Sequence, residues 1–344
     1  MHNTVMIAMS GGVDSAVAAH LCAASSHAAG VTMQHFAECG DRDATDAAAV
    51  CTMLGIPHYV AHLEEAFAQN VILPFIESYE AGMTPNPCIF CNKRVKFGAL
   101  LDFARANGYE GIATGHYARL EKSDSGRMLI RRAADVTKDQ TYMLYTLTQD
   151  VLTRARFPLG EMTKKQVREM ALTLGFTAAE RDDSQDICFV PDGDYAAFIA
   201  RFTGRTPKTG CFLDEHGNVL GTHKGQLHYT IGQRKGLGIS MGEPAYVIAK
   251  SAENNSVTLG KNEALFKKRL VAKHINLITQ DNLLVPQKLL AKIRYSQSLT
   301  TARVEQTGED EITVEFDAPQ RAISSGQSLV LYEDDYLVGG GIIT

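Results

Sequence analysis

Residues 4–15 read TVMIAMSGGVDS, an apolar stretch that predicts a β-strand and runs directly into a turn with two adjacent glycines. Because Gly11 and Gly12 lack Cβ atoms, the backbone can turn tightly there and approach a ligand. The helix expected after the turn presents unpaired N–H groups and a positive dipole end, which together bind anions. Asp14 would repel phosphate unless Mg²⁺ lay between them, so the turn predicts a metal–phosphate ligand. An ordinary strand–helix turn capped by Asp14 and Ser15 is the alternative.

The segments around this turn alternate between strand-like and helix-like patterns through residue 116. Short apolar or β-branched segments predict strands at 4–9, 30–36, 58–63 and 111–116. Alanine- and leucine-rich segments predict helices at 14–26, 42–55 and 64–80, and a Thr start and a Gly stop bound a further helix at 163–175. Strands that alternate with helices in this way form a parallel sheet covered by helices on both faces.

The chain changes character after about residue 200. Gly-rich turns appear first, and residues 246–260 predict two strands joined by an Asn-rich turn. From about Leu270 onward only strands are expected, and their spacing predicts a small antiparallel barrel; they are 288–296, 301–306, 311–316, 328–333 and 336–344.

We therefore predict an α/β protein of three domains. The first, over 1–200, is a doubly wound parallel-sheet domain that carries the anion-binding turn. The second, over 201–266, is a small central domain with a Gly-rich loop at 225–242. This loop is either a mobile segment that orders on a partner or closes over the site, or a plain connector. The third, over 267–344, is the C-terminal β-barrel.

Composition describes a soluble globular protein. Hydrophobic residues make up 45% and charged residues 21% of the 344, and no apolar run is long enough to span a membrane. The N-terminus lacks the basic-then-apolar form of a signal peptide. The seven cysteines are an odd number in a chain without export signals, so we expect reduced thiols and a cytoplasmic protein with no membrane partner.

Charge is distributed unevenly along the chain. Residues 1–92 hold one basic residue and nine acidic ones, a net charge of −8, whereas the whole chain carries −5. The remainder therefore carries +3, in local basic clusters at 93–96, 127–132, 164–168 and 267–269. Solvated surface is the simpler interpretation of any single cluster, but together they fit an anionic partner held away from the N-terminal segment.

The complete hexapeptide SGGVDS after a first strand resembles the signature of the PP-loop ATP pyrophosphatases. That resemblance implies transfer of AMP to an oxygen with release of pyrophosphate. It differs from a Walker A motif because no G-K-[ST] follows.

Seven further motifs narrow the resemblance to the tRNA-specific 2-thiouridylase family. They occur in order over nearly the whole chain: TPNPCIFCNKRVKF (84–97), ATGHYAR (113–119), KDQTYMLYTL (138–147), FPLGEMTKKQVR (157–168), DSQDICFV (183–190), HYTIGQRKGLGI (228–239) and GGGII (339–343). The resemblance implies ATP-dependent 2-thiolation of the uridine at the first anticodon position, the wobble uridine. It also implies tRNA as partner, and a sulfur donor that is a persulfide relay protein, a cysteine desulfurase or free sulfide.

The resemblance also implies roles for individual residues. It assigns the ATP site to Ala8, Met9, Ser10, Gly11, Gly12, Val13, Asp14 and Ser15, with Met33 and Gly115. It places Asn86, Pro87 and Cys88 near the target base, and His116, Lys138, Asp139, Gln140, Arg294, Tyr295 and Gln327 against tRNA. Cys91 resembles the first catalytic cysteine and Cys188 the sulfur-carrying one.

The chemistry suits these residue types. Uracil C2 is a poor electrophile, and AMP transfer to its oxygen makes that oxygen a leaving group for sulfur to displace. A persulfide on Cys188 supplies the sulfur, with Cys91 reducing it or closing a disulfide as product leaves. The thiolate is the reactive form, so both cysteines need a lowered pKa. We expect the adjacent Lys93 and Arg94, and a helix that begins near Asn92, to lower the pKa of Cys91.

One position departs from the commonly described family pattern, in which an aspartate stands where this chain has Cys88. Cys88, Cys91 and Cys188 then make three thiols, which suit a four-iron iron–sulfur cluster with one open iron. In that case Cys188 is a ligand and carries no persulfide. The alternatives are an inert Cys88 with persulfide catalysis, or zinc held by the three thiols and a histidine.

Two other functions stay open at this point. The first is another PP-loop enzyme, such as a 2-thiocytidine synthase or an amidotransferase-type synthetase. The thiocytidine enzymes resemble this chain in thiol count but lack its C-terminal barrel, and a synthetase would not need the thiols. The second is a non-enzymatic, metal-bearing tRNA-binding protein, which the intact turn with Asp14 disfavours.

Overall fold

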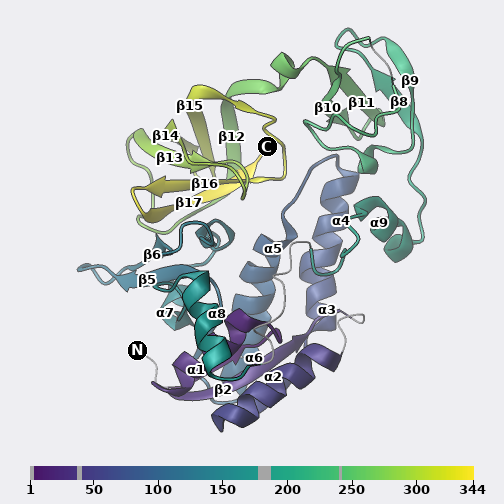
Figure 1. The fold of residues 1–344 in the computed structure, drawn as a ribbon. Helices are drawn as coiled ribbons and strands as arrows, with labels where there is room; N and C mark the ends of the chain where they lie inside the picture. Colours follow the sequence, from purple (N-terminus) through teal and green to yellow (C-terminus); the bar gives the residue numbers. More distant parts are fainter. Residues whose placement is uncertain (1–3, 37–40, 177–186, 240–241) are drawn as a thin grey trace.

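The computed structural model describes residues 4–36, 41–176, 187–239 and 242–344. Its strands form three sheets, which Figure 1 shows as an α/β unit from the N-terminal part, a small β unit and a C-terminal barrel. The predicted fold class is confirmed. No helix within these ranges is long and apolar enough to cross a membrane.

The first sheet is parallel and has the strand order β3-β2-β1-β4-β7. Its strands are β1 (Thr4–Ala8), β2 (His27–Gln34), β3 (His58–His62), β4 (Gly111–Ala113) and β7 (Ala155–Arg156). Ile7 of β1 is in register with Gly30 on one side and Ala113 on the other, so the strand that enters the glycine turn lies in the interior of the sheet.

Both faces of this sheet are covered, as the alternation along β1 requires. Met6 packs into the cluster that contains Phe97 and Leu100, whereas Val5 and Ile7 pack into the opposite cluster. The opposite face is covered by α1 (Val13–Ala23), α2 (Asp41–Leu54) and α8 (Lys164–Thr173), and α8 packs on α1. Fully buried alternate residues on both faces are expected for a central strand of a doubly wound sheet.

The face that contains Met6 is covered by one helical run that changes its winding. It consists of α5 (Pro87–Phe90), the π-helical segment η2 (Cys91–Ala99) and α6 (Leu100–Ala106). The Asn86 side chain accepts a hydrogen bond from the Cys88 N–H at 3.1 Å and so caps its start. The helix that we expected to begin near Asn92 therefore begins at Pro87, which suits a first-turn position because proline has no N–H to satisfy.

The remaining helices connect this unit to the small β unit or bridge strands. They are α3 (Glu64–Phe67), the π-helical η1 (Ala68–Ile72), α4 (Leu73–Glu80), α7 (Gln149–Arg154) and α9 (Tyr195–Thr203), with short 3₁₀ turns at Thr141–Met143, Gln226–His228 and Asn262–Leu265. The helix expected over 64–80 is thus one run with a π-helical middle. The capped helix expected over 163–175 is confirmed as α8, whose Thr163 and Gln166 form a capping box.

The small β unit is a four-stranded sheet in the order β10-β11-β8-β9. Its strands are β8 (Gly210–Leu213), β9 (Val219–His223), β10 (Tyr246–Ser251) and β11 (Ser256–Gly260). The two strands predicted within 246–260 are confirmed as the β10–β11 pair.

The C-terminal barrel closes because its first strand also pairs with its last. Its strands are β12 (Phe266–Leu277), β13 (Gln287–Lys292), β14 (Thr300–Gly308), β15 (Glu311–Arg321), β16 (Ser328–Glu333) and β17 (Tyr336–Ile343). They follow the order β12-β15-β14-β13-β16-β17, and the β12–β17 pairing completes the ring. The strand predicted at 288–296 is shorter than expected, since β13 ends at Lys292.

A hairpin from the N-terminal part of the chain extends the barrel sheet. It consists of β5 (Ala118–Lys122) and β6 (Met128–Arg132), and β6 pairs with β17 through Arg131 and Tyr336. The sequence analysis did not predict this hairpin. It lies directly below β16 and β17 in Figure 1, so a hairpin from the N-terminal part of the chain belongs to the barrel sheet, which is separate from the parallel sheet.

Candidate active site

The glycine turn folds as the sequence analysis predicted. Gly11 has φ +68°, which favours glycine, and a Cβ there would lie 3.1 Å from the Asp43 backbone. The Ser15 hydroxyl donates to the Gly12 carbonyl at 2.9 Å and accepts from the Ser10 N–H at 3.2 Å. These bonds hold the turn closed at the start of α1, so the first N–H groups of the helix face the space beyond β1.

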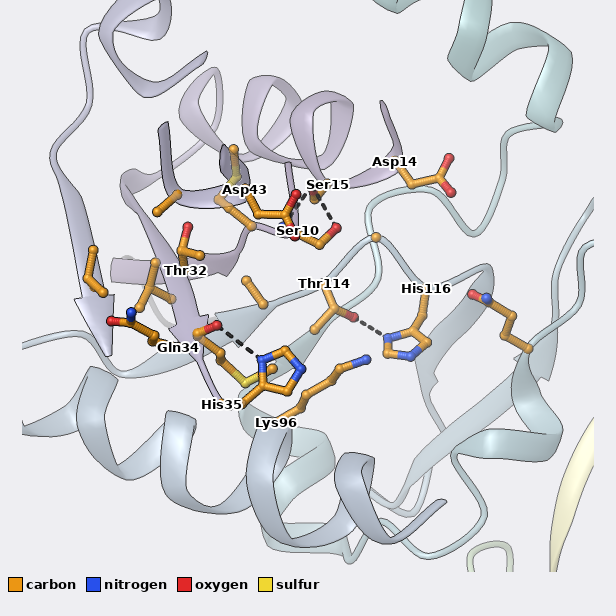
Figure 2. A pocket seen from close by; sticks show the side chains of 18 residues that line it. Ser10, Asp14, Ser15, Thr32, Gln34, His35, Asp43, Lys96, Thr114 and His116 are labelled. Carbon is orange, nitrogen blue, oxygen red and sulfur yellow. Dashed lines mark hydrogen bonds between the residues drawn. The ribbon is translucent and has the colours of Figure 1, made fainter. Parts of the chain in front are cut away.

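Asp14 is neutralised by the protein itself. The Lys164 ammonium contacts both Asp14 carboxylate oxygens at 2.8 Å, and the Tyr117 hydroxyl donates to Oδ1 at 2.8 Å. Lys164 is only 7% exposed, and Figure 2 shows the Asp14 carboxylate directed away from the cavity. Lys164 thus supplies Asp14 with a counter-charge in the protein itself, and the Mg²⁺ predicted from Asp14 stays a prediction.

A cavity of about 350 Å³ opens beside the turn. Its walls come from the turn, the end of β2, the end of β4 and η2, as expected where parallel strands end at their carboxyl edge. The lining includes the predicted ATP-site residues Ala8, Met9, Ser10, Asp14, Ser15, Met33 and Gly115. The volume lies within the range of small-molecule sites.

Gly115 allows the loop after β4 to pass over the start of α1. A Cβ on Gly115 would lie 2.9 Å from the Asp14 carbonyl carbon, so any larger residue would push this loop away from the turn. The next residue, His116, lines the cavity between Phe97 and Phe157, and its Nδ1 lies 2.6 Å from the Thr114 hydroxyl. Desolvation, with a contribution from the Lys96 charge, holds the His116 pKa well below its usual value, so the imidazole is neutral.

The two cysteines of TPNPCIFC lie at the start of the helical run. Cys88 is exposed in α5, and Cys91 is half-buried as the first residue of η2. Burial raises the pKa of Cys91 to about 11, with Lys96 lowering it and Cys88 raising it further. Desolvation likewise raises the pKa of Cys88, against the opposing effect of Lys96. The lowered pKa that we expected for Cys91 is wrong in this state, because burial outweighs the nearby positive charge.

Cys188 lies in a segment that packs on the same aromatic cluster as Cys91. Its neighbours Ile187 and Phe189 belong to a cluster that includes Phe67 and Phe75, and Cys91 packs against that cluster too. Cys188 itself is exposed. Asp183 and Asp186, which precede it, and Cys39 lie outside the described residues.

The three cysteines do not form a metal-ligand group in this structure. Within the described ranges, no three His, Cys, Asp or Glu side chains are close enough together to hold a metal ion. A cluster on three cysteines needs all three sulfurs at one point. The described arrangement thus supports neither the predicted iron–sulfur cluster nor zinc, and both stay predictions.

Most of the predicted tRNA contacts lie where the TPNP loop meets the barrel. The Gln327 amide donates to the Thr84 carbonyl at 2.7 Å, and the Thr84 N–H donates to the Ser325 carbonyl at 2.9 Å. Arg294 donates to the Ala322 carbonyl in the same barrel loop.

Tyr295 completes this junction. Its ring lies 6.0 Å from the Tyr142 ring, its side chain is 39% exposed, and Cys88 contributes to a raised Tyr295 pKa, after desolvation and Asp139. An exposed tyrosine beside Cys88 offers a surface on which a base can stack.

The segment Lys138-Asp139-Gln140 has mixed surroundings. Asp139 is 5% exposed, pairs with Arg132 at 3.5 Å and accepts a hydrogen bond from the Thr141 hydroxyl at 2.9 Å. Gln140 accepts from the Tyr117 N–H at 2.9 Å and lines the cavity, whereas Lys138 is half-buried. A contact between tRNA and this segment is thus simplest through Lys138.

Family profiles match almost the whole chain in three parts. The tRNA methyl transferase HUP domain matches residues 3–192, the tRNA methyl transferase PRC-barrel domain 196–261 and the Aminomethyltransferase beta-barrel domain 267–343. A protein of Clostridioides difficile named tRNA-specific 2-thiouridylase MnmA is 46% identical over 355 residues, covering 100% of this chain and 98% of that protein. The chain belongs to the tRNA-specific 2-thiouridylase family. Two further proteins of that name are similar to it: the one from Clostridium kluyveri is 47% identical over 355 residues, and the one from Lachnoclostridium phytofermentans is 44% identical over 352. Each comparison covers at least 98% of this chain and of the relative.

Two functional candidates of this 2-thiouridylase were missed at the sequence level. Lys164 was noted only as part of a basic cluster, and nothing in the sequence paired it with Asp14 150 residues away. Lys96 was noted beside Lys93 and Arg94, but those two are exposed and Lys96 alone of the three lines the cavity. The spacing from Cys91 to Lys96 gave no signal, because five residues along an α-helix turn the side chain about 140° away.

Proposed function

We propose that this protein is an ATP-dependent tRNA uridine 2-sulfurtransferase that converts the wobble uridine to 2-thiouridine. The observation that carries the proposal is that one helical segment, η2, begins at Cys91 and contributes Lys96 to the wall of the nucleotide-sized cavity. ATP activates an oxygen, and sulfur must then reach the carbon that carries this oxygen. The nucleotide site and the thiol site must therefore lie next to each other. The names and full-length likeness of the relatives support the same activity.

In the first step, the uracil C2 oxygen attacks the α-phosphorus of ATP and pyrophosphate leaves. The turn holds the phosphates through α1 N–H groups and the Ser10 hydroxyl, and Lys164 keeps the Asp14 charge from opposing them. Mg²⁺ enters as the counter-ion of ATP, and Asp43, which lines the cavity, is placed to meet it. The neutral His116 imidazole contributes a polar wall without adding charge.

In the second step, sulfur replaces the adenylated oxygen. The Cys188 thiolate first takes the outer sulfur of a persulfide on the donor, a relay protein or a cysteine desulfurase, and the donor leaves as a thiol. The terminal sulfur of the Cys188 persulfide then attacks C2 while AMP leaves with the original oxygen. The Cys91 thiolate then attacks the Cys188 sulfur, so that the S–S bond to the tRNA breaks, the 2-thiouridine leaves as product and a Cys91–Cys188 disulfide forms. A dithiol reductant restores both thiols.

The raised Cys91 pKa belongs to the state without substrates, and the protein must lower it or exchange the proton when tRNA binds. We propose that Asn86, Pro87 and Cys88 contact the target base, and that His116, Lys138, Asp139, Gln140, Arg294, Tyr295 and Gln327 form the tRNA surface around it. The mechanism runs through thiols alone, and a cluster on Cys88, Cys91 and Cys188 stays a separate prediction that metal analysis tests.

The test is direct. The protein is incubated without oxygen with ATP, Mg²⁺, unmodified tRNA, a dithiol reductant and a cysteine desulfurase with cysteine as the persulfide donor, and digested tRNA is examined for 2-thiouridine by mass spectrometry. We expect 2-thiouridine at the wobble position, with AMP and pyrophosphate released. Consumption of ATP on tRNA without 2-thiouridine would contradict the proposal and favour another PP-loop tRNA-modifying enzyme.

Iron and acid-labile sulfide are measured on the same anaerobic sample. A colourless, iron-free protein that forms 2-thiouridine supports the persulfide route. Iron bound in proportion to protein, and lost in Cys88→Asp, would instead support the cluster.

A further inference from the structure

The nucleotide cavity has an unusual charge balance. Among the described residues that line it, Lys96 is the only lysine or arginine. Of the two lining carboxylates, Asp14 pairs with Lys164 and is directed away from the cavity, and Asp43 is the other. Burial lowers the pKa values of the lining histidines His35 and His116, so neither contributes a positive charge at neutral pH. A nucleoside triphosphate bound here therefore meets one cationic side chain, Lys96, and the N-terminus of α1.

The winding of η2 explains how Lys96 reaches the cavity. In a π-helix the backbone bond joins residue i to i+5, so Lys96 lies one turn above Cys91 and on the same face. Lys93 and Arg94 are exposed on the other side of the segment. Figure 2 shows the Lys96 side chain rising from the helix into the space between His35 and His116, across from Ser10 and Ser15 of the turn.

The same ammonium also acts on the sulfur side. Its positive charge lowers the pKa values of Cys88 and Cys91, against the larger opposing effect of burial. It acts on His116 as well. One side chain is thus electrostatically coupled both to the wall of the nucleotide cavity and to the two cysteines.

We propose that Lys96 is a catalytic residue that pairs with the phosphate joining AMP to the wobble uracil in the adenylated tRNA. This inference rests on the proposed function. When sulfur attacks C2, the C2–O2 bond breaks and its electron pair leaves with AMP, so the phosphate gains negative charge. A fixed cation at that phosphate stabilises the departing AMP, and its effect is greatest in the step in which sulfur enters.

The consequence is a specific form of failure when Lys96 is lost. The adenylated uracil would persist until water hydrolyses it, which regenerates uridine and releases AMP without thiolation. A variant without this charge should therefore consume ATP unproductively, whereas a variant that merely folds poorly should lose AMP release and thiolation together.

The experiment compares Lys96→Met, Lys96→Gln and Lys96→Arg with the matched control Lys93→Met, which removes the same charge two residues from Cys91 on the exposed side. Single-turnover reactions with wild type and each variant measure 2-thiouridine and AMP in the same samples. We expect about a 100-fold slower thiolation in Lys96→Met and Lys96→Gln, and fewer 2-thiouridines per AMP. Lys96→Arg should retain thiolation within about 10-fold of wild type, and Lys93→Met within about twofold.

Equal thiolation by Lys96→Met and Lys93→Met would overturn the inference. So would an unchanged ratio of 2-thiouridine to AMP in both folded neutral variants, since Lys96 would then act only in binding ATP. Absence of 2-thiouridine from the wild type in the same assay would instead overturn the proposed function, so the two failures are distinguishable.

Discussion

The nucleotide cavity and the thiol region of this protein are built in different ways. The cavity is assembled within one α/β unit, where β1, β2 and β4 end and η2 passes beside them. The thiol region is assembled from segments of distant sequence: the TPNP loop with Cys88 and Cys91, the barrel loop with Gln327, and the segment with Cys188.

The electrostatic states of the nucleotide cavity and the thiol region also differ. In the cavity, Lys164 already pairs with Asp14, and the turn is closed by its own hydrogen bonds, so the site is prepared for an anion before one binds. In the thiol region, burial holds Cys91 as a thiol with a pKa of about 11. Under the proposed function, this difference means that the ATP site is pre-organised, whereas the thiol region needs tRNA to complete it.

The largest expected effect is on thiolation, in a variant that should leave ATP binding unchanged. Cys91→Ser removes the sulfur nucleophile but leaves the cavity walls unchanged, so thiolation should fall by a factor on the order of 10³ or more. ATP binding measured by equilibrium dialysis should stay within about twofold of wild type. Cys211→Ser, at an exposed position in the small β unit, is the control and should behave as wild type in both assays. Equal losses of ATP binding and thiolation in Cys91→Ser would show that the regions are not separable.

The next effect tests whether the cavity is pre-organised. Lys164→Met leaves Asp14 without its ammonium partner, so the free energy of unfolding should fall by about 2 kcal/mol, below the cost for a fully buried pair because Asp14 is partly exposed. Urea unfolding measures it, and the apparent ATP affinity should fall about 10-fold because the carboxylate opposes phosphate. Lys165→Met is the matched control, since that neighbour is 84% exposed and pairs only loosely with Glu169. Adding Asp14→Asn to Lys164→Met should restore most of the stability; a double variant as unstable as the single one would refute the pairing.

A smaller effect concerns pH and the neutral His116. Its folded pKa lies well below the unfolded value of about 6.5, so between these values the unfolded chain binds more protons than the folded one. Stability should therefore fall as the pH drops below about 6.5, by up to about 1.4 kcal/mol per pH unit from this residue. Urea unfolding from pH 7.5 to 5 measures the slope, which should be shallower in His116→Gln. Identical slopes in wild type and His116→Gln would contradict the neutral assignment.

The smallest effect concerns the junction between loop and barrel. Gln327→Ala removes the hydrogen bond to the Thr84 carbonyl, worth about 1 kcal/mol, and so loosens the loop that precedes Cys88. We expect the KM for tRNA to rise about fivefold with no change in the KM for ATP. Gln287→Ala, elsewhere in the barrel, controls for loss of a glutamine. If Gln327→Ala changed the KM for ATP instead, Gln327 would act on the nucleotide cavity, and the prediction would be contradicted.

Much of the cavity was predictable from sequence because its parts are local. A strand, two glycines and a helix start within twelve residues define the turn. Met33 and Gly115, which the family resemblance implied, line the same cavity because β2 and β4 end at the same edge of the sheet. The barrel strands were likewise visible as alternating segments. These features depend on backbone geometry that neighbouring residues determine.

What the sequence did not predict depends on contacts between distant segments. The β5–β6 hairpin joins the barrel through β17, which lies about 200 residues further along the chain. The Lys164–Asp14 pair joins positions 150 residues apart, and the π-helical winding that aligns Lys96 with Cys91 has no sequence signature. The pKa of Cys91 was predicted in the wrong direction because charges are visible in a sequence and burial is not.

The account depends most on the claim that ATP activates the very oxygen that sulfur replaces. We would test it with tRNA that carries ¹⁸O at C2 of the wobble uridine, in a single-turnover reaction analysed by mass spectrometry. We predict that AMP gains one ¹⁸O atom for each 2-thiouridine formed. If 2-thiouridine forms while AMP carries no ¹⁸O, or if ADP is the product of ATP, the account is contradicted.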